Sequence, residues 1–407
     1  LKMDFLGLRT LTVIRDAETA VQKHHPEFSI QKLDYDDPDT YRMLGQGDTE
    51  GVFQLESSGM KQVLVGLQPQ NLEDIIALIS LYRPGPMDSI PTCLRNRHEP
   101  DKISYKTPQL AHILDVTNGC IVYQEQVMQI FRELAGFSFG QADNVRRAMS
   151  KKKHAVMEAE REHFVYGCTD PGNECPGCVA NGISEKVANE IYDEMSSFAS
   201  YAFNKSHAAC YAYVAFQTAY LKCHYPSEFM AALLTSVLDN TDKVIEYSGE
   251  CARLGIKVLP PDVNVSNGGF TADGSGQIRF GLNAVKNVGR NLIENVVKGR
   301  QNKPYTGLYD FCKRMHGNEL NRRAVECLIK AGAFDHLGNN RHSHVEAVEG
   351  ILKSIETDSR RNLDGQLDLF SVMSGEAQSG ASEDNYEIKQ LPEYSHKELL
   401  QQEKEVS

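Results

Sequence analysis

Hydrophobic and polar positions follow two different periods in the first part of the chain. Residues 1–5 alternate between apolar and polar, which predicts a short strand. Apolar residues then recur at helical spacing from Leu8 to Val21, so a helix should follow at once. Asp4, near the end of the strand, is placed to ligate a metal ion; the alternative, which a lone aspartate favours, is a cap of that helix.

Helical patterns dominate the centre of the chain. Asn71 is the predicted cap of a helix that ends at the sequence Arg83-Pro-Gly-Pro86. A further helix is expected around residues 121–128. A long apolar and aromatic helix over residues 206–225 has aromatic side chains on more than one face, which predicts deep burial. The next helix should cover residues 228–238, after a proline that favours its first turn.

The last third of the chain has shorter elements. Residues 259–262 read as a domain boundary, and residues 270–280 as a small β-hairpin around Asp-Gly-Ser-Gly. Two short helical units follow, and residues 371–384, rich in Ser, Gly and acidic side chains, read as a flexible linker. We therefore predict a mainly α, multi-domain fold with minor β structure.

Composition places the chain among globular proteins. Its 407 residues are 41% hydrophobic and 24% charged, enough for two or three domains. It has no apolar run long enough for a membrane span and no signal peptide, and its ten scattered cysteines favour a reducing compartment. Because the first residue is leucine, we expect a piece of a longer polypeptide.

A basic block contrasts with the net charge of -12. Residues 146–153 hold five cations in eight positions, and helical spacing puts Arg147 and Lys151 on one face, with Arg146 on an adjoining face. Such a face could hold a triphosphate or a nucleic-acid backbone, since arginine offers two parallel donors. The alternative is a solvated surface helix.

Two further segments could contact phosphate. Residues 287–293 have the form of a helix-hairpin-helix, whose backbone N–H groups at Gly289 and the next helix start would grip one phosphate. Residues 320–334 read as a second, less standard unit. A tight helical turn without DNA contact is the alternative. Residues 201–208 bring together Lys205, which can neutralise a phosphate, and His207, which could be a general acid but is more often a structural hydrogen-bonding residue. No Ser-His-Asp triad is readable.

Two short motifs suggest other partners. Residues 366–370, Gln-Leu-Asp-Leu-Phe, place apolar anchors beside a polar linker, as in a peptide that docks into a pocket; the alternative is the last turn of a core. A zinc site could form from one histidine and three cysteines, because the last two cysteines have the Cys-x-x-Cys spacing; the alternative is a surface loop. The four candidate zinc ligands are His163, Cys168, Cys175 and Cys178.

Taken together, several segments resemble the alpha subunit of bacterial DNA polymerase III, a C-family replicative polymerase. They occur in the family's order and cover most of the chain. The matching segments are Lys2-Met-Asp-Phe-Leu-Gly-Leu8, Gly51-Val-Phe-Gln-Leu-Glu-Ser57, Tyr82-Arg-Pro-Gly-Pro-Met87, Tyr123-Gln-Glu-Gln-Val-Met128, Arg146-Arg-Ala-Met149 with Lys151-Lys-Lys153, and Phe203-Asn-Lys-Ser-His207. The cysteine-rich loop at 168–178 departs from the family pattern.

The resemblance implies a role in template-directed DNA synthesis. Asp4 looks like one of three palm carboxylates that hold two Mg²⁺ ions, and the other two would lie upstream, so we expect this chain alone not to polymerise. The implied contacts to the triphosphate of the incoming dNTP come from cations in three segments. They are Arg146 and Arg147, with Arg83, Lys151, Lys152 and Lys205 as further candidates.

The resemblance also implies partners and domains. The implied contacts to primer-template DNA are Val288, Gly289, Arg290, Asn291, Arg322 and Arg323, and those to the beta sliding clamp are Gln366, Leu367, Asp368, Leu369 and Phe370. Other replicase subunits are expected partners, a membrane is not, and the location would be the cytoplasm. The implied domains are the palm end (1–15), the fingers (16–235), a helical region with tandem hairpins (236–340) and a clamp-binding segment with its linker (341–407).

A second interpretation is a non-catalytic DNA-binding adaptor with hairpin units and a clamp peptide. It accounts for residues 280–370. It leaves Asp4, the paired arginines 146–147 and the segment 82–87 without a role.

Overall fold

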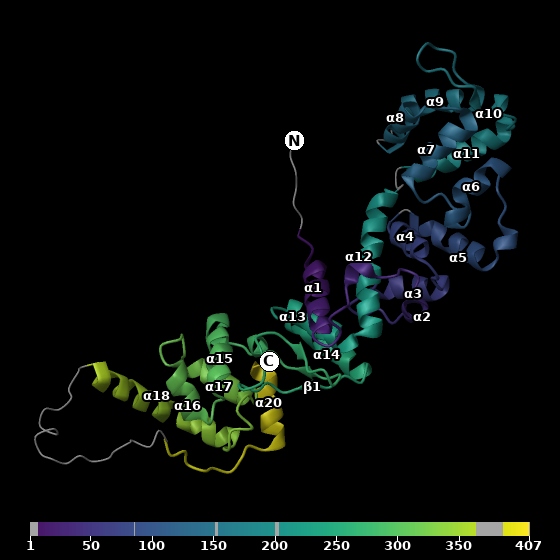
Figure 1. Ribbon diagram of the computed structural model, residues 1–407. Helices are drawn as coiled ribbons and strands as arrows, with labels where there is room; N and C mark the ends of the chain where they lie inside the picture. Colours follow the sequence, from purple (N-terminus) through teal and green to yellow (C-terminus); the bar gives the residue numbers. More distant parts are fainter. Residues whose placement is uncertain (1–6, 85, 151–153, 200–202, 364–385, 407) are drawn as a thin grey trace, which may run out of the picture. The chain divides into compact units, whose positions relative to one another are not determined.

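The computed structural model describes residues 7–84, 86–150, 154–199, 203–363 and 386–406. Contacts divide the chain into two compact units (Figure 1). The central unit is residues 30–224, and the flanking unit joins residues 1–29 to residues 225–407. The mainly helical prediction is confirmed, since the described residues contain only one small three-stranded sheet.

The first helical group of the central unit surrounds a buried helix, α4. Asn71 Oδ1 accepts the Asp74 N–H at 3.0 Å, so the predicted cap is confirmed, and the helix ends before Pro84 as expected. Nearly all of α4 is buried because its residues are apolar around the whole circumference. The helices of this group are α2 (Pro38–Gly45), α3 (Ser58–Leu67), α4 (Leu72–Leu81), α5 (Ile90–His98) and α12 (Lys205–His224).

A second group in the central unit packs around aromatic side chains. Phe131 meets Phe164 edge to face with ring centres 5.0 Å apart, and Tyr192 lies 6.0 Å from Phe131. Gly136 ends α7 in the left-handed conformation that glycine adopts without strain. The group consists of α6 (Ala111–Leu114), α7 (Gln124–Ala135), α8 (Phe139–Ser150), α9 (His154–Tyr166), α10 (Gly177–Ala180) and α11 (Glu185–Ala199). Figure 1 shows α7 to α11 gathered together.

Helix α12 corrects one expectation. Its buried face is made mainly of small residues at helical spacing, including Ala208, Ala212, Ala215 and Ala219, which allow close packing on α4. Phe216 is buried, but Tyr213 is 44% exposed, so the deep burial predicted for the aromatic residues is wrong. The helix is apolar on several faces because one face packs on α4 and other faces carry aromatic side chains at the surface.

The flanking unit begins with two packed helices. Helix α1 (Arg9–Gln22), predicted from residue 8 onward, packs on α13 (Pro226–Ser236), and α14 (Thr241–Arg253) follows. The predicted hairpin is confirmed as β2 (Thr271–Ala272) and β3 (Ile278–Arg279), paired antiparallel. Strand β1 (Val258–Leu259) adds a parallel partner to β3, so the sheet order is β1-β3-β2.

Five helices form the rest of the flanking unit around one hydrophobic core. They are α15 (Arg290–Asn302), α16 (Leu308–Met315), α17 (Arg322–Lys330), α18 (Arg341–Leu363) and α20 (His396–Val406). Arg341 fixes α20, because its guanidinium pairs with Glu403 at 2.8 Å and with Asp335 at 2.7 Å. Helix α20 therefore packs against the hydrophobic core of this unit.

Short 3-10 helices connect the longer elements, at Ile30–Lys32, Pro86–Ser89, Pro100–Lys102, Pro108–Leu110, Asp115–Thr117 and Leu282–Ala284. Residues 259–262 lie inside the flanking unit, and the domain boundaries implied by the resemblance stay predictions. The predicted strand at residues 1–5 lies outside the described residues, as do Asp4 and the linker at 371–384.

Candidate nucleotide and nucleic-acid sites

The starts of α7 and α12 lie side by side in the central unit. The Gln124 N–H donates to the Phe203 carbonyl at 3.0 Å, and the Phe203 N–H donates to Val122 at 3.4 Å. Gln126 closes the start of α7, because its Oε1 accepts the N–H groups of Val122 and Tyr123 at 2.9 Å each. We call this contact between residues 122–126 and 203–205 the helix-start joint.

Glu125 caps the second helix of the joint. Its carboxylate accepts the Lys205 N–H at 3.1 Å and an Asn204 Nδ2–H at 3.0 Å. Asn204 Oδ1 in turn accepts the His207 N–H at 2.9 Å. A carboxylate at a helix N-terminus opposes the positive end of the helix dipole, so the joint is fixed by electrostatics as well as by backbone pairing.

Two predicted arginines approach the joint from α8. Arg146 donates to Asp143 Oδ1 at 2.7 Å and to Gln124 Oε1 at 2.8 Å. Arg147 pairs with the other oxygen of Asp143 at 2.8 Å, and its side chain is 64% exposed. Hydrogen bonding from Arg146 is the main influence that lowers the pKa of Asp143 below its usual value, so the carboxylate stays charged.

Two more of the cations predicted to contact the triphosphate reach the joint from other elements. Arg83, just after α4, lies with its guanidinium carbon 4.2 Å from the centre of the Phe203 ring. Lys205 Nζ pairs with Glu73 at 2.9 Å and lies 5.3 Å from the centre of the Tyr123 ring. Burial raises the pKa of Tyr123, so its phenol stays neutral beneath the ammonium group. The structure thus brings three motifs of the sequence to one place.

An open cleft of about 470 Å³ adjoins the joint. Arg146, Asp143 and Asn204 line it, together with the exposed ring of Phe139. Arg132 and the carboxylates of Glu125 and Glu133 line the cleft as well. Lys151 and Lys152, which continue the basic block, lie outside the described residues.

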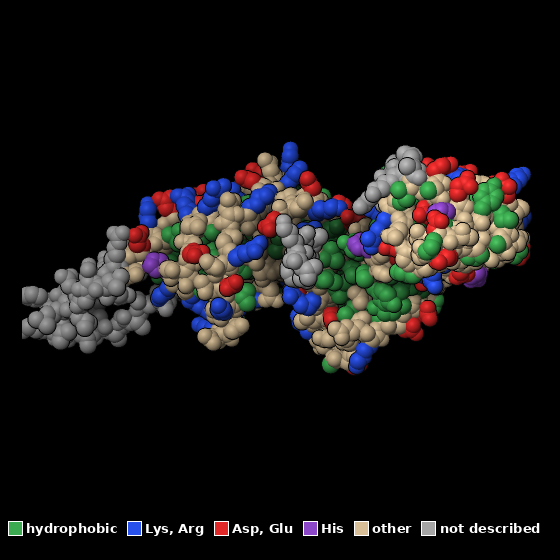
Figure 2. All heavy atoms as spheres, turned by 90° about the horizontal axis from the view of Figure 1, so that it is seen from above, with side chains coloured by type: hydrophobic (Ala, Val, Ile, Leu, Met, Phe, Trp, Pro, Cys, Tyr) green, Lys and Arg blue, Asp and Glu red, His purple; other side chains and the backbone are tan. Residues whose placement is uncertain are grey.

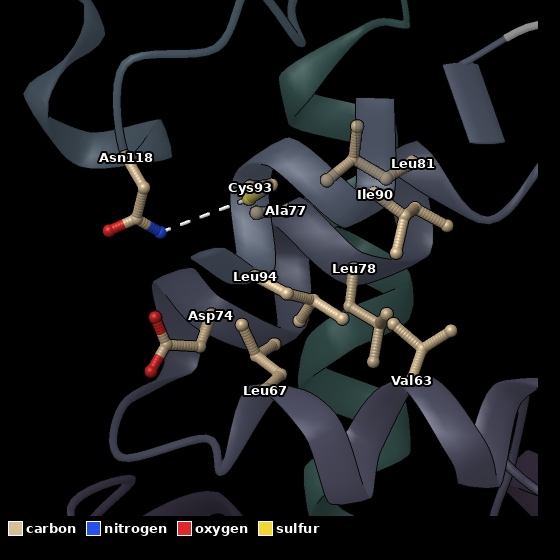
Figure 3. Close-up of a pocket in the computed structure, with 10 residues that line it drawn as sticks. All are labelled: Val63, Leu67, Asp74, Ala77, Leu78, Leu81, Ile90, Cys93, Leu94 and Asn118. Carbon is tan, nitrogen blue, oxygen red and sulfur yellow. Dashed lines mark hydrogen bonds between the residues drawn. The ribbon is translucent and has the colours of Figure 1, made fainter. Parts of the chain in front are cut away.

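A second cavity, enclosed by α3, α4 and α5, is a packing defect rather than a site (Figure 3). Its volume is about 10 Å³, which is close to the limit for a single water molecule. Asp74 at its edge pairs with Arg97 at 2.8 Å, and Asn118 Nδ2 donates to Cys93 Sγ at 3.9 Å. These polar groups have partners in the protein and do not point to a ligand.

The predicted zinc site is not assembled. The four predicted ligands are all described, yet no three of their ligand atoms lie within 4.8 Å of one another in the described part of the chain. His163 Nδ1 faces Glu160 at 3.3 Å, and the two cysteines at 168 and 175 pair through their backbones. Burial raises the pKa of Cys178 to about 12, so without a metal ion its thiol stays protonated. The loop is held by backbone hydrogen bonds instead.

The first predicted DNA contact lies at the start of α15. Gly289 precedes the helix, and no side chain caps the helix start. The first helix expected of a helix-hairpin-helix is replaced by the short 3-10 helix Leu282–Ala284. The Arg290 side chain is 71% exposed, and one of its guanidinium nitrogens lies 3.5 Å from a carboxylate oxygen of Asp239. The side-chain amide of Asn291 donates to Glu319 Oε1 at 3.2 Å. Val288 packs partly against the core behind this turn. The exposed N–H groups of this helix start are available to an anion.

The second predicted contact, at α17, is less open. Asn321 Oδ1 caps the helix by accepting the Ala324 N–H at 2.9 Å. Arg322 is tied to Glu326 at 2.6 Å and to Glu349 at 2.7 Å, whereas its exposed neighbour Arg323 lies beside it on the same first turn. Figure 2 shows Lys and Arg side chains interspersed with Asp and Glu on the face in view. Because the two signs of charge are mixed on this face, an anion would bind to a local group of cations rather than to a broad positive surface.

Three residues in or beside the joint were missed in the sequence: Gln124, Glu125 and Asp143. The first two lie inside a motif that was singled out, and Asp143 is one helical turn before Arg146, so the signal was present. The predicted clamp-binding residues 366–370 lie outside the described residues. No described helix combines the length and apolar character needed to cross a membrane.

The central unit carries the cleft, which arginines and carboxylates line together, and the flanking unit carries the hairpin turn; both features agree with a segment of a nucleic-acid polymerase. Residues 10–172 match the family model described as bacterial DNA polymerase III alpha subunit finger domain, and residues 255–344 match the helix-hairpin-helix motif. The chain is 43% identical to DNA polymerase III subunit alpha of Bacillus subtilis over 91% of its length, 44% identical to that of Xylella fastidiosa over 100%, and 46% identical to that of Thermus aquaticus over 91%.

The chain belongs to the family of bacterial DNA polymerase III alpha subunits. It spans about a third of the length of these relatives, covering 32%, 33% and 30% of them, respectively. The family consists of DNA-directed DNA polymerases that act in replication, and DNA polymerases in general depend on Mg²⁺. The match to the finger domain covers residues 82–87 and the paired arginines 146–147, which the adaptor interpretation left without a role.

Proposed function

We propose that this chain provides the nucleotide-binding fingers and the duplex grip of a replicative DNA polymerase, which transfers a nucleotide from a dNTP to a primer 3′-OH. The observation that supports this best is the helix-start joint. Arg83, Arg146 and Lys205 come from segments far apart in the sequence, and each contacts a residue of the joint. Such convergence is what binding of a compact polyanion requires.

Electrostatic neutralisation is the proposed contribution of these residues to the reaction. The Arg147 side chain is more exposed than that of Arg146, and it pairs only with the carboxylate of Asp143. Its guanidinium can therefore turn toward a triphosphate. Arg146 is held from two sides and acts as a fixed donor at the wall of the cleft. Donors that are oriented before the substrate arrives stabilise charge that develops during phosphoryl transfer.

Asp4 is proposed as one carboxylate ligand of the catalytic Mg²⁺ ions. A carboxylate suits a hard cation such as Mg²⁺, which neutralises charge on the phosphate oxygens when it is bound. Lys151 and Lys152 are proposed to extend the positive face of α8 toward the triphosphate.

The flanking unit is proposed to hold duplex DNA through its backbone. A phosphate would accept N–H groups from Gly289, Arg290 and Asn291 at the start of α15, with the exposed Arg290 and Arg323 side chains adding charge. A methyl group on Gly289 would meet nothing closer than Glu319 at 3.7 Å. Glycine is therefore not needed by the fold at this position, which agrees with a role in close approach of a phosphate.

Residues 366–370 are proposed to bind the beta sliding clamp. Such a tether keeps the enzyme near its template by raising the effective concentration. Other replicase subunits are proposed partners, and the place of action is the bacterial cytoplasm, at the nucleoid.

The test is primer extension by a full-length polymerase that contains this segment, with Mg²⁺ and all four dNTPs. We expect Asp4→Asn to abolish extension while binding of primer-template DNA stays normal. If the unmodified polymerase extends no primer although it binds duplex DNA, the adaptor interpretation replaces this proposal.

A further inference from the structure

The loop between α9 and α10 begins and ends at two cysteines that lie opposite each other. The Cys168 N–H donates to the Cys175 carbonyl at 2.9 Å, and the Cys175 N–H donates to the Cys168 carbonyl at 2.9 Å. The two residues form an isolated antiparallel bridge, and residues 169–174 between them are all exposed. Figure 1 shows this loop projecting from the helices that it connects. We call Cys168 and Cys175 the loop-base pair.

The backbone pairing brings the two side chains together. Residues that exchange both backbone hydrogen bonds in an antiparallel pair have Cα atoms about 5.5 Å apart. A disulfide joins Cα atoms about 4.4 to 6.8 Å apart, so this spacing suits a disulfide. Directly opposite residues also carry their side chains on the same face of the pair. The two Cβ atoms must move slightly closer to form the bond, and a bridge of one pair with an exposed turn can adjust.

Close packing of the backbone beside the loop-base pair keeps its two residues opposite each other. A methyl group on Gly167 would meet the Cys175 carbonyl oxygen at 2.6 Å, and one on Gly177 would collide with the backbone of Gly167. The two strands therefore pass each other too closely for any side chain at these glycines. The pair is a fixed feature of the loop base, whereas the turn between the two cysteines is open to solvent.

The two thiols of the pair differ in access. Cys168 is partly exposed, whereas Cys175 is buried and its thiol donates to the His163 carbonyl at 3.7 Å. Burial raises the pKa of Cys175 above its ordinary value. A small reagent in solution therefore reaches Cys168 first, and Cys175 is the thiol that reacts second. Cys178, the third cysteine of the loop, is fully buried.

We propose that the loop-base pair is a reversible redox site that exchanges with a low-molecular-weight disulfide. Cys168, as the thiolate, attacks one sulfur of that disulfide; the bond between the reagent's two sulfur atoms breaks, and one reagent thiolate leaves. Cys175 then attacks Cys168, the protein disulfide forms, and the second reagent thiolate leaves. The two cysteine protons end on the two released thiols, so the pair loses the two electrons that the reagent gains.

The exposure of the loop makes the reaction reversible. An exposed disulfide has a more oxidising potential than a buried structural one, so an excess of small thiol returns it to two thiols by the same steps in reverse. The second step of oxidation is intramolecular, and its rate benefits from the high effective concentration of Cys175 beside Cys168. No residue of the helix-start joint takes part, so the site is independent of the proposed function.

The experiment equilibrates a full-length polymerase that contains this segment with mixtures of reduced and oxidised glutathione. Acid stops the exchange, and N-ethylmaleimide then labels every remaining thiol in denaturant. Trypsin cuts after Arg161 and Lys186, so all three loop cysteines fall in the peptide 162–186. We expect the number of labels on this peptide to fall from three to one, with the remaining label on Cys178. The unlabelled pair should be lighter by two hydrogen atoms, and a thiol reductant should restore all three labels.

Cys210, an exposed cysteine on α12, is the matched control in the same digest. A lone thiol forms only a mixed disulfide with glutathione, so its oxidised-to-reduced ratio depends on the ratio of the two glutathione forms. The ratio for an intramolecular disulfide depends on the square of the reduced glutathione concentration. Tenfold dilution of both forms should therefore raise the oxidised-to-reduced ratio of the loop-base pair about tenfold and leave that of Cys210 unchanged.

Cys168→Ser tests which cysteines are joined. This change removes a partly exposed sulfur, and we expect both remaining cysteines of the peptide to keep their labels. Loss of the Cys175 and Cys178 labels in this variant would show that those two cysteines are joined instead, and would overturn the proposal. Three labels on the wild-type peptide in oxidised glutathione alone would also overturn it. Zinc that must be chelated away before these cysteines take any label would make them metal ligands rather than a redox pair.

Discussion

Replacing Arg147 by alanine removes a cation from the proposed nucleotide site at little cost to the fold. The side chain is 64% exposed and pairs with Asp143 four residues earlier on the same helix. Exposed pairs at this spacing stabilise a helix by about 0.3–0.5 kcal/mol, so unfolding should change by less than about 1 kcal/mol. Asp143 keeps its two hydrogen bonds from Arg146, and the pair of helices at the joint is left in place.

The effect on nucleotide use should be much larger. A hydrogen bond to a charged group contributes about 1.5–3 kcal/mol, and about 1.4 kcal/mol corresponds to a tenfold change in rate. We therefore expect kcat/KM for dNTP incorporation to fall about 10-fold to 100-fold. Arg147→Lys should recover part of this loss, because it restores the charge without the two parallel donors.

The assay is steady-state incorporation of a single nucleotide by a full-length polymerase that contains this segment, with binding of primer-template DNA measured alongside. Arg42 provides a matched control, because it is 67% exposed and pairs at 2.7 Å with Asp39 on its own helix, as Arg147 does with Asp143. Arg42→Ala should leave kcat/KM unchanged. If both alanine variants have the same kcat/KM, Arg147 does not contact the triphosphate and the reasoning fails.

Three further results are expected. Gly289→Ala should change the free energy of unfolding by no more than about 1 kcal/mol, because a methyl group at this position meets no close neighbour. The same change should weaken binding of duplex DNA measured by anisotropy, and unchanged binding would remove the start of α15 from the DNA contacts. Burial lowers the pKa of His344 below its usual 6.5, so unfolding free energy should be highest above about pH 6.5 and fall as the pH drops below it, and denaturant titrations should show less of this fall in His344→Gln. Phe370→Ala should reduce clamp-dependent processivity and spare short extension without the clamp; loss of both would indicate a folding defect.

Local features of the structure were open to prediction from the sequence. Asn71 caps α4 because a side-chain oxygen three residues before an N–H can reach it whatever the rest of the fold does. The end of that helix before Pro84 and the turn between β2 and β3 likewise depend on the conformational limits of proline and glycine. The family resemblance was carried by short motifs of the same local kind.

The geometry of the site required the tertiary structure. Tyr123 and Phe203 are far apart in the chain, and only the tertiary fold brings their backbones together. The same packing gives Arg146 a partner in Gln124 and places Arg83 over Phe203.

The cysteine-rich loop and α12 show the opposite case, in which a pattern suggested more than the fold provides. Cys-x-x-Cys spacing is necessary for many zinc sites, but the four ligand atoms do not meet, because backbone pairing of the loop and burial fix them separately. The many aromatic residues of α12 suggested a buried helix, yet its alanines pack on α4, and Tyr213 is exposed although Phe216 is buried. The sequence by itself determined the family that the chain resembles and those helices, such as α4, whose start and end signals are local, whereas helices such as α11 and α18 were not predicted from it. Which side chains meet was decided by long-range packing, because those contacts depend on residues that no local pattern connects.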